Sequence, residues 1–375
     1  MRVIGVLLFV FALGCFYYLA LFEPSKDRPT SEALSISKKV VSPKKTIKNE
    51  GKETKLSLIA VGDIMMARSV GAMIKVKGAD EPFRLVSSIL KKADLTVANL
   101  ESPLSSKGAA LIGKDVVFRG EPSGAQGIKN SGIDAVSLAN NHALDYGPEA
   151  LQETIGLLDK NGLRHAGAGL NLTDAIRPAY LKTGGKKVSF LAYSYILPNR
   201  FYPTETKAGV APARADAGNI LSQIKMAKRK SDLLVIYFHW GAEYQDYPLR
   251  YQRELAHKSI DAGADLVLGA HPHVIQGLEV YKKKLIAYSL GDFVFDHYSR
   301  KTGETFILRV NLSSKSGTMK AEIIPVYVTA SGQPTLVYGK EAGSILTRLL
   351  KISEIFGTQL VIEGDRAKLT FDSEK

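Results

Sequence analysis

The chain has 375 residues, 45% of them hydrophobic and 23% charged, which excludes a disordered or fibrous protein and fits one or two globular domains. Fifty basic residues against 37 acidic ones give a formal net charge of +13. Cys15 is the single cysteine, so the chain alone can build neither a disulfide framework nor a zinc–thiolate site. Any metal site must therefore consist of histidine, carboxylate and amide side chains.

An uninterrupted run of apolar, aromatic and small residues extends from Val3 to Phe22. A helix of this length spans about 30 Å, the thickness of a bilayer core. We expect residues 1–22 to form an uncleaved transmembrane signal anchor; a cleaved signal peptide and a lipoprotein signal ending at Cys15 are the alternatives. Because long C-terminal domains are translocated largely regardless of charge, we expect a single-pass protein of the cell membrane, in contact with the lipid bilayer, with the bulk of the chain outside the cytoplasm.

Residues 23–54 are rich in lysine and serine and contain eight basic and five acidic residues without a hydrophobic period. This composition predicts a disordered, solvated stalk. Without residues 1–54, 41 basic and 32 acidic residues remain, a net charge of +9. The excess charge points only weakly to a polyanionic partner, and no nucleic-acid motif accompanies it, so nucleic acid is not an expected partner.

From residue 55 onward, short apolar runs alternate with amphipathic stretches, which predicts an α/β protein with largely parallel strands. The expected strands are 56–61, 95–98, 133–138, 233–238 and 266–268, and the expected helices are 148–160, 217–230 and 251–262. A hairpin around Gly184-Gly185 and late strands at 285–290 and 304–311 add antiparallel pairs. We expect one domain over 55–314 and a small α+β extension over 315–375, with a strand at 321–328 and a helix at 342–356.

Polar residues follow five of the predicted strands, at the edge of the sheet where ligands bind in open α/β folds. They are Asp63, Glu101, Asn141 with His142, His239, and His271 with His273. Nitrogen and oxygen ligands without sulfur predict a site for one or two divalent cations, with Mn, Zn or Fe favoured over Mg or Ca. Taken singly, each residue also fits a turn, a helix cap or a buried histidine. If the segment is extended, His271 and His273 point the same way and reach neighbouring metals.

The order of these motifs resembles a divergent calcineurin-like metallophosphoesterase signature, and more closely the CapA/PgsA-like family of capsular poly-γ-glutamate synthesis proteins. The resemblance covers about residues 56–330. The segments that carry it are Val61-Gly62-Asp63, Asn99-Leu100-Glu101, Asn140-Asn141-His142, His239-Trp240-Gly241, His271-Pro272-His273 and Ser289-Leu290-Gly291-Asp292.

The resemblance implies a four-layer α/β/β/α metallophosphoesterase-like sandwich tethered to the membrane, with poly-γ-glutamate or its synthase subunits as partners. It also implies roles for single residues: Asp63 and His273 hold the first metal, Glu101 bridges, and Asn141, His239 and His271 hold the second. His142 is then the general acid or a hydrogen-bond donor to the transition state.

Two positions depart from the usual phosphoesterase pattern. Met65 stands where the usual Asp-x-His motif has its histidine, and Glu101 replaces the bridging aspartate. Both departures are shared with the CapA-like branch, and they speak against ordinary phosphatase activity. The sequence thus leaves two functions open: a metal-dependent hydrolase, or a non-catalytic polymer-binding or scaffold subunit of a membrane synthase complex.

Further polar residues are candidates to line the cleft: Arg68, Arg119, Glu243 and Asp292. Surface or cap roles are equally compatible with each of them. The three remaining histidines, His165, His257 and His297, are expected to be structural or solvated, although His297 lies close to a strand end.

Overall fold

A computed structural model describes residues 55–214, 217–297, 299–313 and 319–371. The predicted anchor at 1–22 and the predicted stalk at 23–54 lie outside these residues. Within the described ranges, no helix combines the length and the apolar character needed to cross a bilayer.

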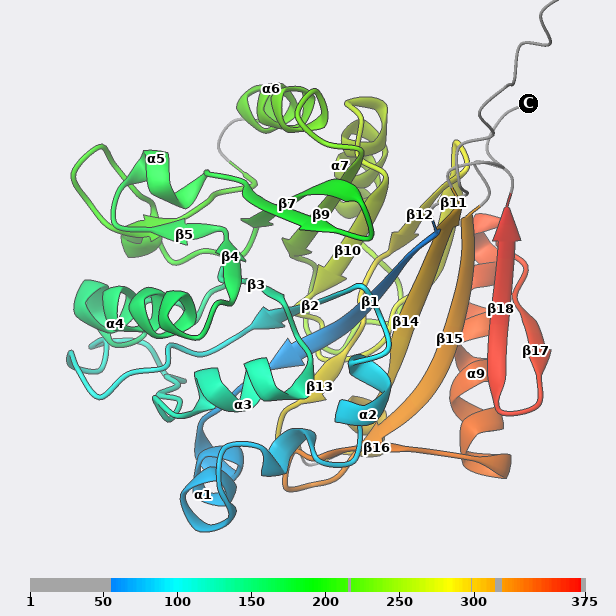
Figure 1. Cartoon of the computed structure of the whole chain (residues 1–375), viewed down its shortest axis with the longest axis horizontal. Helices are drawn as coiled ribbons and strands as arrows, with labels where there is room; N and C mark the ends of the chain where they lie inside the picture. The colour runs from blue at the N-terminus through cyan, green and yellow to red at the C-terminus, as the bar shows by residue number, and fades with distance from the viewer. Residues whose placement is uncertain (1–54, 215–216, 298, 314–318, 372–375) are drawn as a thin grey trace, which may run out of the picture. The chain divides into compact units, whose positions relative to one another are not determined.

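The larger of two main sheets has ten strands and is parallel in one half and antiparallel in the other (Figure 1). Its parallel half consists of β1 (Lys55–Ile64), β2 (Leu95–Leu100), β3 (Ala135–Ser137) and β4 (Arg164–Ala166), with the short β13 (Asp292–Val294) parallel to the end of β1. Its antiparallel half consists of β14 (Glu304–Ser313), β15 (Met319–Val328), β16 (Pro334–Leu336), β17 (Val361–Glu363) and β18 (Arg366–Phe371).

The second sheet has six strands in the order β11-β12-β10-β9-β7-β6. Four of them are parallel neighbours: β12 (Lys284–Ala287), β10 (Leu266–Ala270), β9 (Leu233–His239) and β7 (Lys186–Ser194). The edges are antiparallel, formed by β11 (Leu278–Tyr281) and β6 (Ala179–Thr183). A small separate pair joins β5 (Ala168–Gly169) and β8 (Gly209–Val210).

Strand β9 shows how the two sheets share the core. Val235 and Tyr237 belong to the same apolar cluster as the ten-stranded sheet, whereas Ile236 and Phe238 belong to a second cluster with residues of α6 (Ala217–Lys228) and α7 (Arg250–Asp261). Since successive side chains of a strand point to opposite faces, β9 is buried on both. This double burial explains why the sequence shows continuous apolar runs rather than alternation.

The other helices pack mainly on the ten-stranded sheet, and Figure 1 shows α1, α3 and α4 on the side away from α6 and α7. These helices are α1 (Arg68–Lys77), α2 (Ser87–Leu90), α3 (Gly124–Ser131), α4 (Gly147–Lys160) and α9 (Gly339–Ser353); short turns are α5 (Leu172–Ala175), α8 (Arg300–Gly303), η1 (Glu81–Phe83), η2 (Asn199–Phe201) and η3 (Glu354–Phe356). The prediction of an α/β protein is confirmed.

The segment after residue 314 shares the main sheet. Strand β15 pairs with β14 over nine positions, and β18 extends the sheet beyond β15. Helix α9 contributes Ile345, Leu346 and Leu349 to the larger apolar cluster. The proposed domain boundary at 314/315 stays a prediction, but the described part of 315–375 continues the same sheet rather than forming a sheet of its own.

Candidate metal centre

The candidate ligands gather where five strands end. Asp63 is the penultimate residue of β1, Glu101 and His271 directly follow β2 and β10, and His239 is the last residue of β9. These four side chains are buried, with exposed fractions between 0% and 5%. Asn141 and His273 lie beside them and are half-buried. The structure therefore brings the six predicted ligands together at the carboxyl ends of the parallel strands.

Two glycines let the ends of β1 and β13 approach each other. A Cβ added to Gly62 would lie 1.8 Å from the carbonyl oxygen of Gly291, and Gly291 itself has a φ of +73°. The two strands pair with Asp63 opposite Asp292, and the Asp63 N–H donates to the Gly291 carbonyl at 3.0 Å. The two Gly-Asp sequences thus place two buried carboxylates next to each other.

Glu101 has no hydrogen-bond partner for either carboxylate oxygen among the described residues, although the side chain is fully buried. Its Oε1 lies 3.5 Å from His239 Nε2 and 4.0 Å from His142 Nε2. Burial, and then the charge of Asp63, raise the pKa of Glu101 well above its usual range. An unpaired buried carboxylate is costly, so this position calls for either a proton or a cation.

His239 is held between two amides. Asn99 Nδ2 lies 3.3 Å from His239 Nδ1 and also donates to Asp63 Oδ1 at 2.7 Å. On the other side of the ring, Nε2 lies 2.8 Å from Asn141 Oδ1. If Asn99 donates to Nδ1, the proton is on Nε2, and Asn141 accepts it. Asn99 therefore orients both His239 and Asp63, a role that sequence reasoning did not assign to it.

The two histidines of the His-Pro-His turn are not on an extended segment, and that part of the sequence-based reasoning is wrong. His271 has a φ of 95° and His273 a φ of 55°, both in the region that non-glycine residues rarely adopt. The two rings nevertheless converge, with centroids 5.9 Å apart. The His271 N–H donates to Asp63 Oδ2 at 3.1 Å, while His273 Nδ1 lies 2.8 Å from Asp292 Oδ1. Unusual backbone conformations of this kind concentrate at functional sites.

The charges of the cluster favour a cation. Among the described residues, no lysine or arginine pairs with Asp63, Glu101 or Asp292. Burial raises the pKa of Asp63 to about 6, an effect that His273 opposes and Asp292 adds to. Burial also lowers the pKa of His271 to about 3, which keeps this imidazole neutral as a ligand must be.

Three overlapping groups of side chains offer ligand atoms within 4.8 Å of one another. They are Glu101 with His271 and His273, Asp63 with Glu101 and His239, and Asp63 with His273 and Asp292. The mixture of imidazole and carboxylate donors fits one or two divalent transition-metal ions. Asp292, which the sequence marks only as a cleft residue, belongs to the ligand cluster through its contact with His273.

His142 faces the cluster, and contacts with Asp145, Lys114 and Phe118 hold its ring in place. Its Nδ1 lies 2.6 Å from Asp145 Oδ2 and 3.0 Å from Lys114 Nζ, and the Phe118 ring stacks on it at 4.1 Å. Lys114 also forms an ion pair with Asp145. Burial lowers the pKa of His142 to about 4, so the imidazole is neutral near pH 7. The ring thus presents Nε2 to the site while Nδ1 is engaged.

A cavity of about 540 Å³ opens in front of the cluster. Arg68, Glu243 and Asp292, three of the four predicted cleft residues, line it together with Asn141, His142 and His273. The Arg68 guanidinium lies over the rings of Phe118 and Phe295 and pairs with Asp296. Arg119 lies elsewhere: its guanidinium sits 3.7 Å from the centre of the Tyr146 ring and donates to the Gly108 carbonyl.

Of the remaining histidines, His257 contacts Glu279 and His165 contacts Asp159, both away from the cluster. His297 is buried beside the cavity, with Nε2 2.6 Å from the Val328 carbonyl oxygen. The supporting residues that sequence reasoning missed are Asn99, Lys114, Phe118, Asp145 and Asp296. Asn99 lies inside a quoted motif and Asp145 follows another by three residues, so both could have been found there, whereas Lys114 and Phe118 come from a connection without a pattern of its own.

The residues of the candidate metal centre lie in a region that is similar to known proteins. A family model described as bacterial capsule synthesis protein, PGA_cap, matches residues 57–297, which contain the six predicted ligands and His142. The chain is 34% identical over 320 residues to the PGA biosynthesis protein CapA of Bacillus subtilis, covering 84% of this chain and 82% of that protein. It is 32% identical over 318 residues to the capsule biosynthesis protein CapA of Bacillus anthracis, covering 83% and 76% respectively.

Proposed function

Because this chain belongs to the PGA_cap family of bacterial capsule synthesis proteins, we propose that it acts in the synthesis or export of a poly-γ-glutamate capsule and holds divalent metal ions at its buried cluster. Two relatives named for capsule or PGA biosynthesis support the biological role. The partners in this proposal are the polymer itself or the membrane subunits that synthesise it.

The observation that carries the metal site is the environment of Glu101. A fully buried carboxylate without a hydrogen-bond partner among the described residues lies among Asp63, His239, His271 and His273, and no lysine or arginine there pairs with it. A cation held by these residues would neutralise the carboxylates and give Glu101 its missing partner. We propose that Glu101 would be among the residues that hold the metal, in keeping with the role that the family resemblance implies for it.

We propose that the cluster is a hydrolytic centre. A divalent cation held by Asp63, Glu101 and the histidines would supply a water of lowered pKa and polarise an oxygen of the scissile group. If the Nδ1–H of His142 donates to Asp145 Oδ2, the Nε2 lone pair faces Glu101 and the site, and His142 begins as a proton acceptor. If Lys114 donates to Nδ1 instead, the proton is on Nε2 and His142 begins as a donor. Arg68 and Lys114 line the cavity, but each already pairs with a carboxylate, Asp296 and Asp145 respectively, so the positive charge for an anionic substrate would come from the bound cation.

The fold and the location of the protein enter the same proposal. Helices against both outer faces of two packed sheets support a four-layer α/β/β/α metallophosphoesterase-type sandwich. The apolar run at 3–22 supports a single-pass signal anchor, with the bulk of the chain outside the cytoplasm, where a capsule polymer accumulates. Under this proposal residues 23–54 are the stalk between bilayer and domain.

The second candidate function, a non-catalytic polymer-binding or scaffold subunit, is favoured by one observation. Met65 is buried, and its sulfur lies 3.1 Å from the Ala67 backbone nitrogen, so the position that carries a histidine in the usual phosphoesterase motif offers no ligand. A cluster with one ligand fewer can bind a cation as a structural element without turnover.

Metal content tests the proposal directly. The full chain purified from cells supplied with Mn, Zn and Fe is expected to contain at least one of these metals by elemental analysis. Glu101→Gln, which keeps the shape but removes the charge, should lose most of it. Glu279→Gln is the matched control, because Glu279 is also buried but contacts His257 and Tyr288. Wild-type protein without metal, or equal metal in both variants, would contradict the metal site.

The biological role is tested in cells that make poly-γ-glutamate. A strain lacking this protein should lose the capsule or release the polymer, and the wild-type gene should restore it. His142→Ala separates the two candidate functions, because the hydrolase requires this side chain and the scaffold does not. A normal capsule from the His142→Ala strain, together with a defective one from Glu101→Ala, would favour the scaffold.

A further inference from the structure

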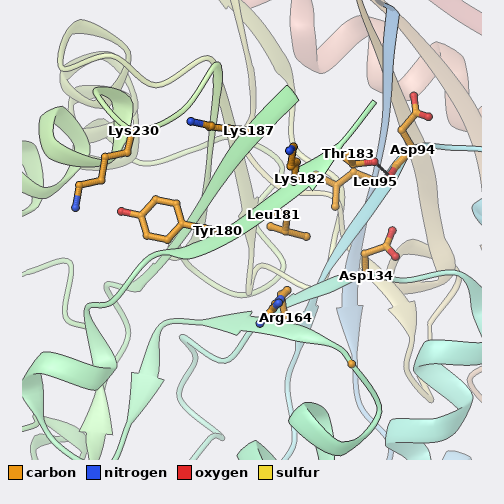
Figure 2. Close-up of a pocket in the computed structure, with 11 residues that line it drawn as sticks. Asp94, Leu95, Asp134, Arg164, Tyr180, Leu181, Lys182, Thr183, Lys187 and Lys230 are labelled. Atoms are coloured by element: carbon orange, nitrogen blue, oxygen red, sulfur yellow. Dashed lines mark hydrogen bonds between the residues drawn. The ribbon is translucent and has the colours of Figure 1, made fainter. Parts of the chain in front are cut away.

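A basic groove lies at the opposite ends of the parallel strands from the candidate metal centre. It has a volume of about 580 Å³ and contains residues at or shortly before the start of strands: Asp94 and Leu95 at β2, Asp134 before β3, Arg164 at β4, Lys187 at β7 and Lys230 three residues before β9. The hairpin strand β6 adds Tyr180, Leu181, Lys182 and Thr183. Figure 2 shows these side chains around the hairpin.

The groove is far from the metal cluster, because the same strands run between them. Along β2, Leu95 lies in the groove and Leu100 precedes Glu101. At about 3.3 Å per residue, the rise from Leu95 to Glu101 is about 20 Å. The groove is therefore a separate place on the molecule and not an extension of the cavity in front of His142.

Four cations line the groove, and within the described part of the chain none of them has a carboxylate partner: Arg164, Lys182, Lys187 and Lys230 are exposed and form no ion pair there. The two aspartates of the groove, Asp94 and Asp134, reduce the excess to two positive charges, and Asp134 also lies 3.6 Å from Lys129 Nζ. Asp94 accepts the Ser57 N–H at 2.9 Å, and Asp134 accepts the Thr96 N–H at 3.0 Å. In Figure 2 both aspartates lie at one end of the group, away from Tyr180 and Lys230.

The register of the hairpin places two of these cations opposite each other. Lys182 on β6 pairs directly with Lys187 on β7. Directly opposed residues of an antiparallel pair have Cβ atoms about 5 Å apart, and two like charges at this position destabilise the pair. One lysine on an edge strand discourages aggregation, but that purpose does not require a second lysine opposite it. An anion bound between the two ammonium groups would turn the repulsion into a pair of attractions.

We propose that this groove binds an anionic polymer chain through its carboxylates, as a second polymer site besides the metal centre. The inference rests on the proposed function, which supplies a polycarboxylate as the molecule the protein handles. Four cations around a recess between the edge strands β4 and β6 can contact several carboxylates of one chain at once. A flat bilayer surface cannot enter the recess, so the geometry favours a flexible chain over a membrane.

The experiment uses the full chain and a fluorescently labelled poly-γ-glutamate in a binding titration. Lys187→Glu is the informative variant, since a glutamate opposite Lys182 replaces a repulsive pair by an attractive one and should raise the unfolding temperature while it weakens polymer binding. We expect binding about threefold to thirtyfold weaker, from one exposed attraction turned into a repulsion. Lys351→Glu is the control, because Lys351 is exposed on α9 and undergoes the same charge change.

Salt and a second ligand complete the test. The difference between wild type and Lys187→Glu should vanish at about 0.5 M salt, where exposed charges are screened within a few ångströms. Equal losses of polymer affinity in Lys187→Glu and Lys351→Glu would show that the effect comes from net charge alone, and they would overturn the groove proposal. The proposal is equally overturned if Lys187→Glu binds polymer normally but loses binding to vesicles of phosphatidylcholine and phosphatidylglycerol, because the partner is then a membrane.

Failure of the groove and failure of the metal centre are distinguishable. Lys187→Glu should keep the metal content of the wild type, and Glu101→Gln should keep the groove component of polymer binding, identified as the part that Lys187→Glu removes. If polymer binding is absent while metal is present, the groove proposal fails alone. If metal is absent while the Lys187→Glu difference persists, the metal centre fails alone.

Discussion

Asp292 offers the sharpest test of the metal cluster, because one hydrogen bond joins it to the candidate ligand His273. Its Oδ1 lies 2.8 Å from His273 Nδ1, which leaves His273 Nε2 as the atom available to a metal. Asp292→Asn keeps the size and an acceptor oxygen but removes the negative charge. Carboxylates that orient a ligating histidine are worth about 10- to 100-fold in metal affinity, or about 1.4 to 2.7 kcal/mol.

The size of the loss identifies the role of Asp292. A loss in that range indicates that Asp292 acts through His273, whereas a larger loss indicates that it binds the cation itself. The assay is titration of Mn²⁺ against a competing chelator at pH 8, with circular dichroism to establish that the variant is folded. Asp296→Asn is the matched control, because Asp296 is buried in the same cleft but pairs with Arg68.

The pH dependence of this loss adds a second constraint. Burial disfavours a charged His273, yet the neighbouring carboxylates, Asp292 above all, raise the pKa of His273 well above its usual range. A metal must displace that proton, and Asp292→Asn lowers the His273 pKa and thereby weakens the competition from protons. The loss of affinity in Asp292→Asn should therefore be smaller at pH 6 than at pH 8. Affinity within about threefold of the wild type at both pH values would refute the reasoning, since even the lower bound for an orienting carboxylate is about tenfold.

Three further predictions concern other parts of the molecule. Metal affinity of the wild type should fall as the pH drops below the pKa of Asp63, which is about 6. The expected slope is about tenfold per pH unit for each proton that the metal must displace. A metal affinity that stays constant between pH 5 and 7 would contradict this prediction. His142→Ala should leave the metal content near that of the wild type but lower turnover by about 10² to 10⁴ on any substrate found, and unchanged turnover would remove His142 from the reaction. The full chain should stay in the membrane fraction after a high-salt wash and become soluble without residues 1–54, whereas a mature chain that begins after residue 15, or lipid on Cys15, would replace the signal anchor by one of its alternatives.

The strands that carry the site could be predicted because they are buried on both faces. A run such as Leu233–Phe238 must be apolar throughout, since alternate residues face two different clusters, and this signal is visible in one sequence. The polar residue that ends each run then stands out. The same logic correctly placed His239 at the end of its strand and Asp63 near the end of its own.

Features that depend on contacts between distant segments could not be predicted in this way. Strand β13 has three residues, too few for a periodic signal, and its importance comes from the register that sets Asp292 opposite Asp63. The left-handed backbone of His271 and His273 is equally invisible, since nothing in His-Pro-His states that the surrounding turn will impose it. Sequence reasoning therefore identified side chains that the fold brings together but assigned a wrong conformation to two of them.

The basic groove is another feature that depends on contacts between segments and could not be predicted from the sequence. Each of its lysines, read alone, is a solvated surface residue, and only the hairpin register reveals that Lys182 and Lys187 oppose each other. Local rules of strand pairing disfavour this arrangement, and a folded protein that breaks such a rule without a compensating contact in its own chain does so most often at a functional site. The charges at the two ends of the strands are opposite in sign: three carboxylates favour a cation at the carboxyl ends, and four cations against two aspartates favour an anion at the amino ends. If both proposals hold, a polyanion bound at the second end would leave the metal cluster accessible, and one molecule would bind a chain in the groove while another part of that chain reaches the cluster.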